Sequence, residues 1–233
     1  MIKLVAFDMD GTIVKYPIPP WYASWDALGQ AAGKQEHFES RLKKYLPQME
    51  TSPDPAKIYA RWVNEDSASL AGIPFSQVEP FLFPLPYIDG FKEFCAYLKE
   101  EKIITGIISG GVGFVARKIQ EENGLDFLIA NEPEIENGTF TGRGKMNVAL
   151  SDIHQRYNKH AHMTKVLGEY KINPSDAAFV GDSFTDLPAW LVSGTRIAIN
   201  PKHYDQWKHK IDDLQIFEDF NAVLSWFKSI HVR

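Results

Sequence analysis

The sequence predicts an α/β fold in which a doubly wound, Rossmann-like parallel sheet carries a helical cap domain inserted after the first strand. Two observations support this prediction. Short, continuously apolar runs alternate with helical patterns, which is typical of strands buried on both faces of a parallel sheet. One long stretch shows helical patterns without a convincing strand. We therefore expect a core domain formed by residues 1–15 and 86–233, and a cap domain formed by residues 16–85.

The strands of the core are predicted by apolar runs that each end in a small or polar residue. Three helical patterns lie between these runs, and one of them places Cys95 on an apolar helix face, where it is expected in the core. In a sheet of this kind, ligands bind at the carboxyl ends of the strands. The predicted strands cover residues 2–7, 103–108, 177–180 and 197–199, and the predicted helices cover residues 90–101, 112–122 and 159–170.

The cap is predicted to contain four helices, separated by proline and glycine residues. Pro47 is expected to end the second of them, because proline removes a backbone donor and disturbs the preceding turn. A cap at this place would cover the strand ends and exclude water from them. The four helical patterns cover residues 21–32, 36–46, 55–71 and 75–83.

A β-hairpin is predicted within residues 131–142. Its turn is Asn137-Gly138, which lies between alternating residues and is the strongest short signal for a hairpin. We expect this hairpin to flank the functional site rather than to form it.

Composition excludes several classes of protein. The chain has 233 residues, 44% of them hydrophobic and 24% charged, which is ordinary for a globular protein. No stretch approaches 18 uninterrupted apolar residues, so a membrane-spanning helix is not expected. Asp8 and Asp10 come too early for a signal peptide, and a single cysteine cannot form an internal disulfide. These features favour a cytoplasmic protein, either a monomer or a homodimer.

The charge balance argues against nucleic-acid binding. The net charge is −5, whereas nucleic-acid binders normally present a basic face. Residues 202–210 contain three lysines and two histidines, but Asp205 and Trp207 interrupt them. We interpret this segment as a solvated surface.

Two carboxylates follow the first predicted strand, within Asp8-Met9-Asp10-Gly11-Thr12. Residues two apart at a strand end point to the same side of the sheet. Burying two like charges is costly unless a cation joins them. A simple turn would explain Asp10-Gly11, but not Asp8, which follows six largely apolar residues.

A second acidic pair, Asp182 and Asp186, follows the third predicted strand. Hard oxygen ligands of this kind suit Mg²⁺. Alternatively, Asp182 or Ser183 caps a helix that runs through Leu191. Either interpretation places a polar group at the edge where Asp8 lies.

Two further sequence features indicate a function less specifically when each is considered alone. Ser109-Gly110-Gly111 offers a hydroxyl and backbone N–H groups at a helix start, which suits an anion, but it is also an ordinary turn. Lys159 or Lys165 would neutralise a phosphoryl group and its neighbouring carboxylates, although most lysines are simply solvated.

Taken in order, these four elements resemble the four motifs of the haloacid dehalogenase superfamily. The phosphoserine-phosphatase-like branch is the most similar, because Ser109-Gly110-Gly111 is followed by Phe114, and because Ala130-Asn131-Glu132 and residues 138–142 also resemble it. The resemblance implies that Asp8 is a nucleophile forming an aspartyl-phosphate, and that Asp10 protonates the leaving alkoxide and then activates water.

The same resemblance implies the remaining roles. Mg²⁺ would be bound by Asp8, by the backbone carbonyl of Asp10 and by Asp182, while Asp186 would hold metal-bound water or orient Lys159. Lys159 fits the branch better than Lys165 by its spacing to Asp182. Residues implied to bind the phosphate are Met9, Thr12, Ser109 and Gly110.

The cap departs from the pattern of phosphoserine phosphatases. Those enzymes grip the amino acid with a glutamate soon after the first motif and an arginine in a cap helix. Here the glutamate position falls near Pro17, and the arginine position falls near Asp66, beside Glu65. Arg61, one helical turn and a residue earlier, is a poor substitute, so phosphoserine is in doubt as the substrate.

Aromatic residues are frequent in the cap. They either pack the cap helices together or form, with Glu65 and Asp66, a cage for a cationic group such as an amine or choline. The residues are Tyr16, Trp21, Tyr22, Trp25, Tyr59 and Trp62.

The sequence thus favours a Mg²⁺-dependent phosphomonoesterase acting on a small phosphorylated metabolite. The alternatives are a phosphotransferase, a phosphatase of the phosphocholine or phosphoethanolamine type, and a non-catalytic binding protein. A nucleotide-binding P-loop motif is absent, and His154, His160 and His162 lack the partners expected of a zinc site.

Overall fold

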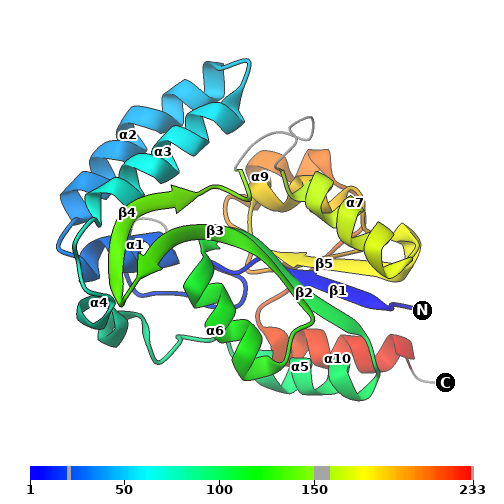
Figure 1. Cartoon of the computed structure of the whole chain (residues 1–233). Coiled ribbons are helices and arrows are strands. Elements are labelled where there is room, and N and C mark those ends of the chain that lie inside the picture. Colours follow the sequence, from blue (N-terminus) through cyan, green and yellow to red (C-terminus); the bar gives the residue numbers. More distant parts are fainter. Residues whose placement is uncertain (20–21, 150–157, 232–233) are drawn as a thin grey trace.

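The structure is a computed structural model that describes residues 1–19, 22–149 and 158–231. Its centre is a seven-stranded sheet in the order β4-β3-β2-β1-β5-β6-β7. Neighbouring strands are parallel except for β3 and β4, which are antiparallel. Helices cover both faces of the sheet (Figure 1). This confirms the predicted fold class, with one antiparallel strand added at an edge.

Among the described residues, no helix is long and apolar enough to cross a membrane. The strands and helices have the following bounds. The strands are β1 Leu4–Phe7, β2 Ile104–Val112, β3 Phe127–Glu136, β4 Thr139–Lys145, β5 Ala177–Gly181, β6 Thr195–Ile199 and β7 Leu214–Phe217. The helices are α1 Ser24–Ala31, α2 Gln35–Thr51, α3 Pro55–Ser69, α4 Phe75–Leu82, α5 Phe91–Glu100, α6 Gly113–Asn123, α7 Lys159–Tyr170, α8 Leu187–Trp190, α9 Tyr204–Trp207 and α10 Phe220–His231, with short 3₁₀ turns at Pro174–Asp176, Phe184–Asp186 and Lys208–Lys210.

The central strand β1 is buried on both faces, which explains its continuous apolar sequence. Val5 and Phe7 point into one hydrophobic cluster, which includes side chains of α5, α6 and α10. Leu4 and Ala6 point into another, which includes side chains of α7 and α8. Figure 1 shows α5, α6 and α10 on one side of the sheet and α7 and α9 on the other. The two cores hold the carboxyl end of β1, and therefore Asp8, in a fixed position.

The hairpin of β3 and β4 turns at Asn137 and Gly138, as predicted. Both residues have positive φ angles, 49° and 76°, which is the conformation that a two-residue type I′ turn requires. Strand β3 also pairs with β2 inside the main sheet. The hairpin thus flanks the site, as predicted, from directly beside a strand that carries site residues.

The cap region after β1 contains the four helices α1–α4, and α2 and α3 project together from the rest of the molecule (Figure 1). The expected end of α2 at Pro47 is wrong, because the helix continues to Thr51. Pro47 removes only the backbone bond to the carbonyl of Lys43, which lies on an exposed turn where water can replace it. The next helix begins as expected, with Asp54 accepting a hydrogen bond from the Lys57 N–H and Pro55 in the first turn.

Candidate active site

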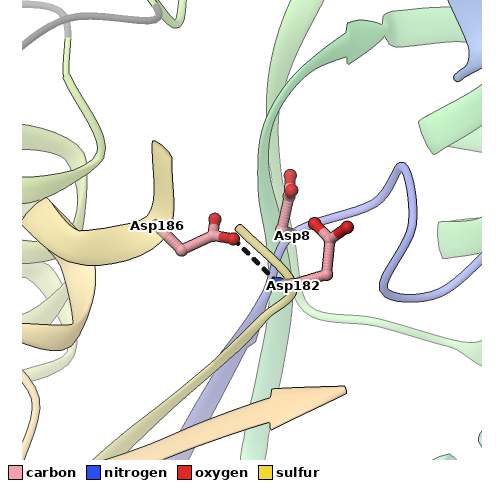
Figure 2. Close-up of side chains that lie close together, drawn as sticks. All are labelled: Asp8, Asp182 and Asp186. Carbon is pink, nitrogen blue, oxygen red and sulfur yellow. Dashed lines mark hydrogen bonds between the residues drawn. The ribbon is translucent and has the colours of Figure 1, made fainter. Parts of the chain in front are cut away.

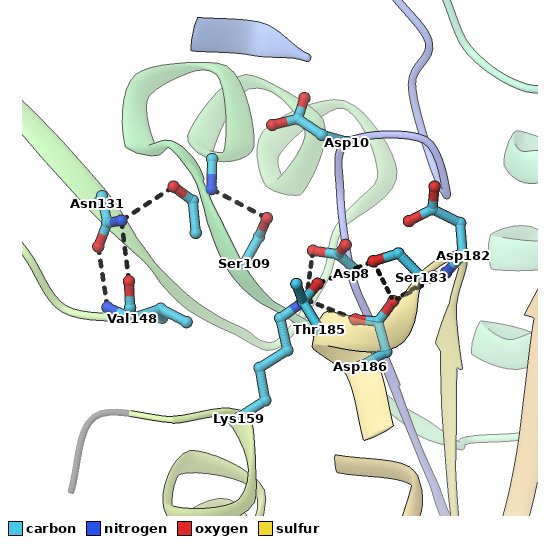
Figure 3. A network of polar contacts seen from close by, with 12 residues as sticks. Asp8, Asp10, Ser109, Asn131, Val148, Lys159, Asp182, Ser183, Thr185 and Asp186 are labelled. Carbon is cyan, nitrogen blue, oxygen red and sulfur yellow. Dashed lines mark hydrogen bonds and ion pairs between the residues drawn. The ribbon is translucent and has the colours of Figure 1, made fainter. Parts of the chain in front are cut away.

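Three neighbouring strands bring the sequence motifs together at one edge of the sheet. Asp8 follows β1, Ser109 lies near the end of β2, and Asp182 follows β5, and these three strands are adjacent. A cavity of about 1030 Å³ opens at this edge and is covered by the cap. Its walls include Asp8, Asp10, Ser109, Gly110, Lys159 and Asp182 (Figure 3).

Lys159 forms two buried ion pairs at the floor of this cavity. Its Nζ lies 2.9 Å from Asp8 Oδ1 and 2.5 Å from Asp186 Oδ1, and its side chain is 2% exposed. Burial alone would lower the pKa of Lys159, but the carboxylates of Asp186 and Asp8 outweigh it and raise that pKa. The other candidate, Lys165, is 68% exposed and lies 3.7 Å from Glu169. The structure thus places Lys159 at the site and Lys165 at the surface.

Three carboxylates crowd together beside Lys159. Oxygen atoms of Asp8, Asp182 and Asp186 lie within 4.8 Å of one another (Figure 2). Both oxygens of Asp186 are occupied, because Oδ1 pairs with Lys159 and Oδ2 accepts hydrogen bonds from the N–H groups of Asp182 and Ser183 at 2.9 and 3.0 Å. Asp186 is therefore better suited to positioning its neighbours than to binding a metal directly.

Asp182 has the opposite character. Its Oδ2 is buried and is held only by an ion pair with the partly exposed Lys202 among the described residues. Burial raises the pKa of Asp182, and the nearby carboxylates of Asp186 and Asp8 add to this effect. The neighbouring buried carboxylates of Asp8 and Asp182 fit a hard divalent cation such as Mg²⁺.

Asp10 is turned toward the cap. Its two oxygens accept hydrogen bonds from the N–H and the hydroxyl of Ser24, each at 2.7 Å, at the start of α1. Both side-chain oxygens of Asp10 thus bind the start of α1. Burial raises the pKa of Asp10 to about 7, even though the bonds from Ser24 oppose this, so the side chain can hold a proton near neutral pH. A Cβ at Gly111 would lie 2.4 Å from Asp10 Oδ2, so glycine is required there.

The Gly110 peptide is held in place from two directions. Its carbonyl accepts hydrogen bonds from Asn131 of β3 at 2.9 Å and from the cap residues Trp25 at 3.0 Å and Tyr59 at 3.4 Å. Beside it, the buried Ser109 hydroxyl accepts a hydrogen bond from the Gly111 N–H at 3.1 Å. The sequence identified Ser109 and Gly110, but it gave Asn131 no place in the site.

Met9 and Thr12 take a different place from the other predicted residues. Both are fully buried, and neither is among the described residues that line the cavity. A Cβ at Gly111 would lie 2.3 Å from Met9 Cε, so the Met9 side chain packs beneath the Ser109 loop. The Thr12 hydroxyl has no hydrogen-bond partner in the described part of the chain. A role for either in phosphate binding stays a prediction.

Lys202 corrects the interpretation of residues 202–210 as a solvated surface. Its Nζ lies 2.7 Å from Asp182 Oδ2, and its side chain, 33% exposed, lines the cavity. The Lys202 N–H also donates to the Asp182 carbonyl at 2.8 Å. The segment after β6 reaches the same sheet edge as Asp8, because β6 is parallel to β5 and beside it. Applying the strand-end rule to the fourth apolar run would have found this residue.

The two acidic residues of the cap are separated in space. Glu65 faces away from the cavity and is bound by Arg41, Tyr45 and Lys44, which lower its pKa to about 2, with the Tyr45 hydroxyl contributing most. Asp66 is only 4% exposed and lines the cavity.

The cap aromatics also divide into two groups. Trp25, Tyr59 and Trp62 line the cavity. Tyr16 is buried and donates to the Leu82 carbonyl at 3.1 Å, so it packs the cap, whereas Tyr22 is 39% exposed. Trp21 and His154 lie outside the described residues.

Comparison with known proteins identifies the family. A model of the haloacid dehalogenase-like hydrolases matches residues 2–194, and the chain therefore belongs to this family. This confirms the resemblance inferred from the four motifs and the expectation of a phosphatase-type enzyme.

Curated relatives and solved structures agree with this assignment. A phosphoserine phosphatase of Methanocaldococcus jannaschii is 24% identical over 97% of this chain and 98% of the relative. One of Archaeoglobus fulgidus is 28% identical over 86% of this chain, which spans only 53% of that longer relative. A substrate-bound phosphoserine phosphatase structure has a TM-score of 0.73 at 22% identity, covering 97% of this chain and 98% of the other. At this identity the structural likeness shows the fold alone.

Proposed function

We propose that the protein is a cytoplasmic, Mg²⁺-dependent phosphomonoesterase that hydrolyses a small phosphorylated metabolite through an aspartyl-phosphate on Asp8. The observation that carries the proposal is the buried cluster of Asp8, Lys159 and Asp186 beside Asp182. This cluster lies at the floor of a cavity that a cap of residues 16–85 covers. The cap limits the substrate to a small molecule.

Each residue has a defined task in this reaction. Asp8 Oδ attacks phosphorus, and the bond from phosphorus to the substrate oxygen breaks. Asp10, whose proton is retained near neutral pH, gives that proton to the leaving alkoxide and then takes one from the water that hydrolyses the aspartyl-phosphate. Ser109 and the Gly110 N–H bind phosphate oxygens, and Lys159 offsets the developing negative charge.

The metal would be held by the carboxylates of Asp8 and Asp182 and by the backbone carbonyl of Asp10. When bound, Mg²⁺ neutralises the phosphate so that an anionic nucleophile can approach it. Asp186 holds Lys159 and the backbone of residues 182–183 in position around that site.

The first experiment measures phosphate release from a panel of small phosphomonoesters, with Mg²⁺ and with EDTA. Turnover that requires Mg²⁺ supports the phosphatase. Added alcohols that divert the phosphoryl group to a new ester in most turnovers would instead indicate a phosphotransferase. Folded, Mg²⁺-loaded protein that turns over no ester would overturn the proposal in favour of a binding role.

Lys202→Met is expected to tighten Mg²⁺ binding about tenfold, which corresponds to about 1.4 kcal/mol. The ammonium of Lys202 competes with a metal ion for Asp182 Oδ2, because both are cations at the same oxygen. Isothermal titration with Mg²⁺ alone gives the dissociation constant directly. The exposed Lys208→Met, which loses only an ion pair with Asp205, serves as the control and should leave the constant unchanged. Weaker binding in Lys202→Met would contradict the competition.

A further inference from the structure

The roof of the cavity carries a buried carboxyl group that forms no close ion pair with the described residues. Asp66 belongs to α3, and its side chain is 6% exposed. Its Oδ1 has no hydrogen-bond partner in the described part of the chain. Among the described residues, the basic group paired with it is His37, whose Nε2 lies 3.9 Å away, beyond hydrogen-bond distance. The cavity therefore presents, at its cap end, one buried carboxyl oxygen without a hydrogen-bond partner among the described residues.

The groups around Asp66 do not neutralise it. Burial and the nearby Arg41 lower the pKa of His37, so this histidine is neutral near pH 7. Arg41 itself is bound to Glu65, which faces the other way. Burial raises the pKa of Asp66 to about 8, although a hydrogen bond from Trp62 and the charge of Arg41 oppose this, so the carboxyl ionises as the pH rises through about 8 or when a cation binds beside it.

Aromatic side chains surround the same end of the cavity. Tyr59 and Trp62 lie edge to face with ring centroids 5.7 Å apart, and Trp25 and Phe38 lie at 6.2 Å, and all four line the cavity. Aromatic faces attract organic cations, and a buried carboxylate increases that attraction. The Asp66 carboxyl group and these aromatic rings together could bind a weakly hydrated ammonium group.

Hydrogen bonds link the end of the cavity that carries Asp66 to the end that carries Ser109 and Gly110. Tyr59 and Trp25 each donate a hydrogen bond to the carbonyl of Gly110, the residue after Ser109. Burial raises the pKa of the Tyr59 hydroxyl, and the carboxyl groups of Asp66 and Asp10 add to the effect, so the hydroxyl keeps the proton that it donates to Gly110. A single small molecule in this cavity would thus meet the anion site at one end and Asp66 at the other.

We propose that the substrate is the phosphomonoester of an amino alcohol, with its positively charged nitrogen held between Asp66 and the rings of Trp25, Tyr59 and Trp62. This inference rests on the proposed phosphatase function and names its substrate class. A carboxylate on the substrate, as in phosphoserine, is disfavoured, because no arginine among the described residues lines the cavity and Asp66 would repel it.

The test compares phosphocholine with its uncharged isostere, 3,3-dimethylbutyl phosphate, which has the same shape without the charge. At pH 9, where Asp66 is ionised, we expect kcat/KM to be at least about tenfold higher for phosphocholine than for its isostere, and likewise for phosphoethanolamine over propyl phosphate. Asp66→Asn should bring each ratio close to one while hydrolysis of the neutral esters continues. Glu65→Gln, a matched change one residue away that faces outward, should preserve the ratios.

A binding measurement tests the proposed cation site without requiring hydrolysis of a substrate. Tetramethylammonium should quench tryptophan fluorescence of the wild type, and should bind about tenfold more tightly at pH 9 than at pH 6, because the proton on Asp66 is lost over that range. Asp66→Asn should show neither binding nor pH dependence. The other groups facing Asp66, namely His37, Arg41, Glu65 and Tyr59, are unchanged in that variant.

The outcomes separate the two proposals. Hydrolysis of charged and neutral esters at equal rates, without tetramethylammonium binding, would overturn the amino-alcohol inference and leave the phosphatase intact. Tetramethylammonium binding that depends on Asp66, without turnover of any ester, would overturn the phosphatase and support the cation site.

Discussion

Asp8→Asn is expected to lower kcat for phosphomonoester hydrolysis by at least about four orders of magnitude. An amide has the shape of a carboxylate but is a far weaker nucleophile, so the aspartyl-phosphate cannot form. Asp8 also pairs with Lys159 at 2.9 Å, and the amide oxygen can still accept that hydrogen bond, so the fold should persist. Phosphate release at saturating ester and Mg²⁺, together with a thermal unfolding curve, measures both parts of the expectation.

A chemical trap identifies the intermediate itself. Wild-type protein quenched with acid during turnover should carry a phosphate that hydroxylamine releases, as an acyl phosphate does, whereas Asp8→Asn should carry none. Asp205→Asn, a matched change at an exposed side chain outside the cavity lining, should keep full activity. A loss of less than about a hundredfold in Asp8→Asn would rule out Asp8 as the nucleophile.

The parts of the fold that were predictable from sequence are those where local pattern and tertiary position agree. Residues 2–7 are apolar because β1 is buried on both faces, and Asp8 stands out because it ends that run. The same logic located the end of β5 to within one residue, whereas β2 continues past the predicted end at residue 108, through Ser109-Gly110-Gly111, to Val112. The boundaries of α7 coincide with the predicted ones, because Asn158 caps the helix and Lys171 adopts a left-handed conformation at its end.

The features that sequence reasoning missed depend on contacts between distant segments. The strand β7 is short and only partly buried at the sheet edge, so its apolar signal is weak. The residues of β3 include Asn131 and Glu132, whose polarity concealed a strand that pairs with β2. The Asn131 side-chain amide donates hydrogen bonds to the carbonyls of Gly110 and Val148. No local sequence pattern predicts such a bridge.

Lys159→Met is expected to cause the largest loss of stability of any single change at the site. Lys159 is the buried cation between Asp8 and Asp186, and removing one member of a buried ion pair costs about 3–5 kcal/mol. For a chain of this length, that corresponds to a decrease in Tm of about 6–20 °C. Lys165→Met removes an exposed lysine of the same helix and should change the free energy of unfolding by less than about 0.5 kcal/mol.

The loss in Lys159→Met should grow as the pH rises. Burial already raises the pKa of Asp186, and Lys159 opposes this, so its removal raises that pKa further. A carboxyl group with a raised pKa binds its proton more tightly in the folded protein than in the unfolded chain. The variant therefore loses stability as the pH increases from the pKa of Asp186 in the unfolded chain to its raised pKa in the folded protein. Mg²⁺ should restore more of the Tm in the variant than in the wild type, because it supplies the missing positive charge. Thermal unfolding between pH 5 and 8, with and without Mg²⁺, tests both statements, and a pH-independent difference in Tm would mean that Lys159 stabilises the fold through packing rather than through its charge.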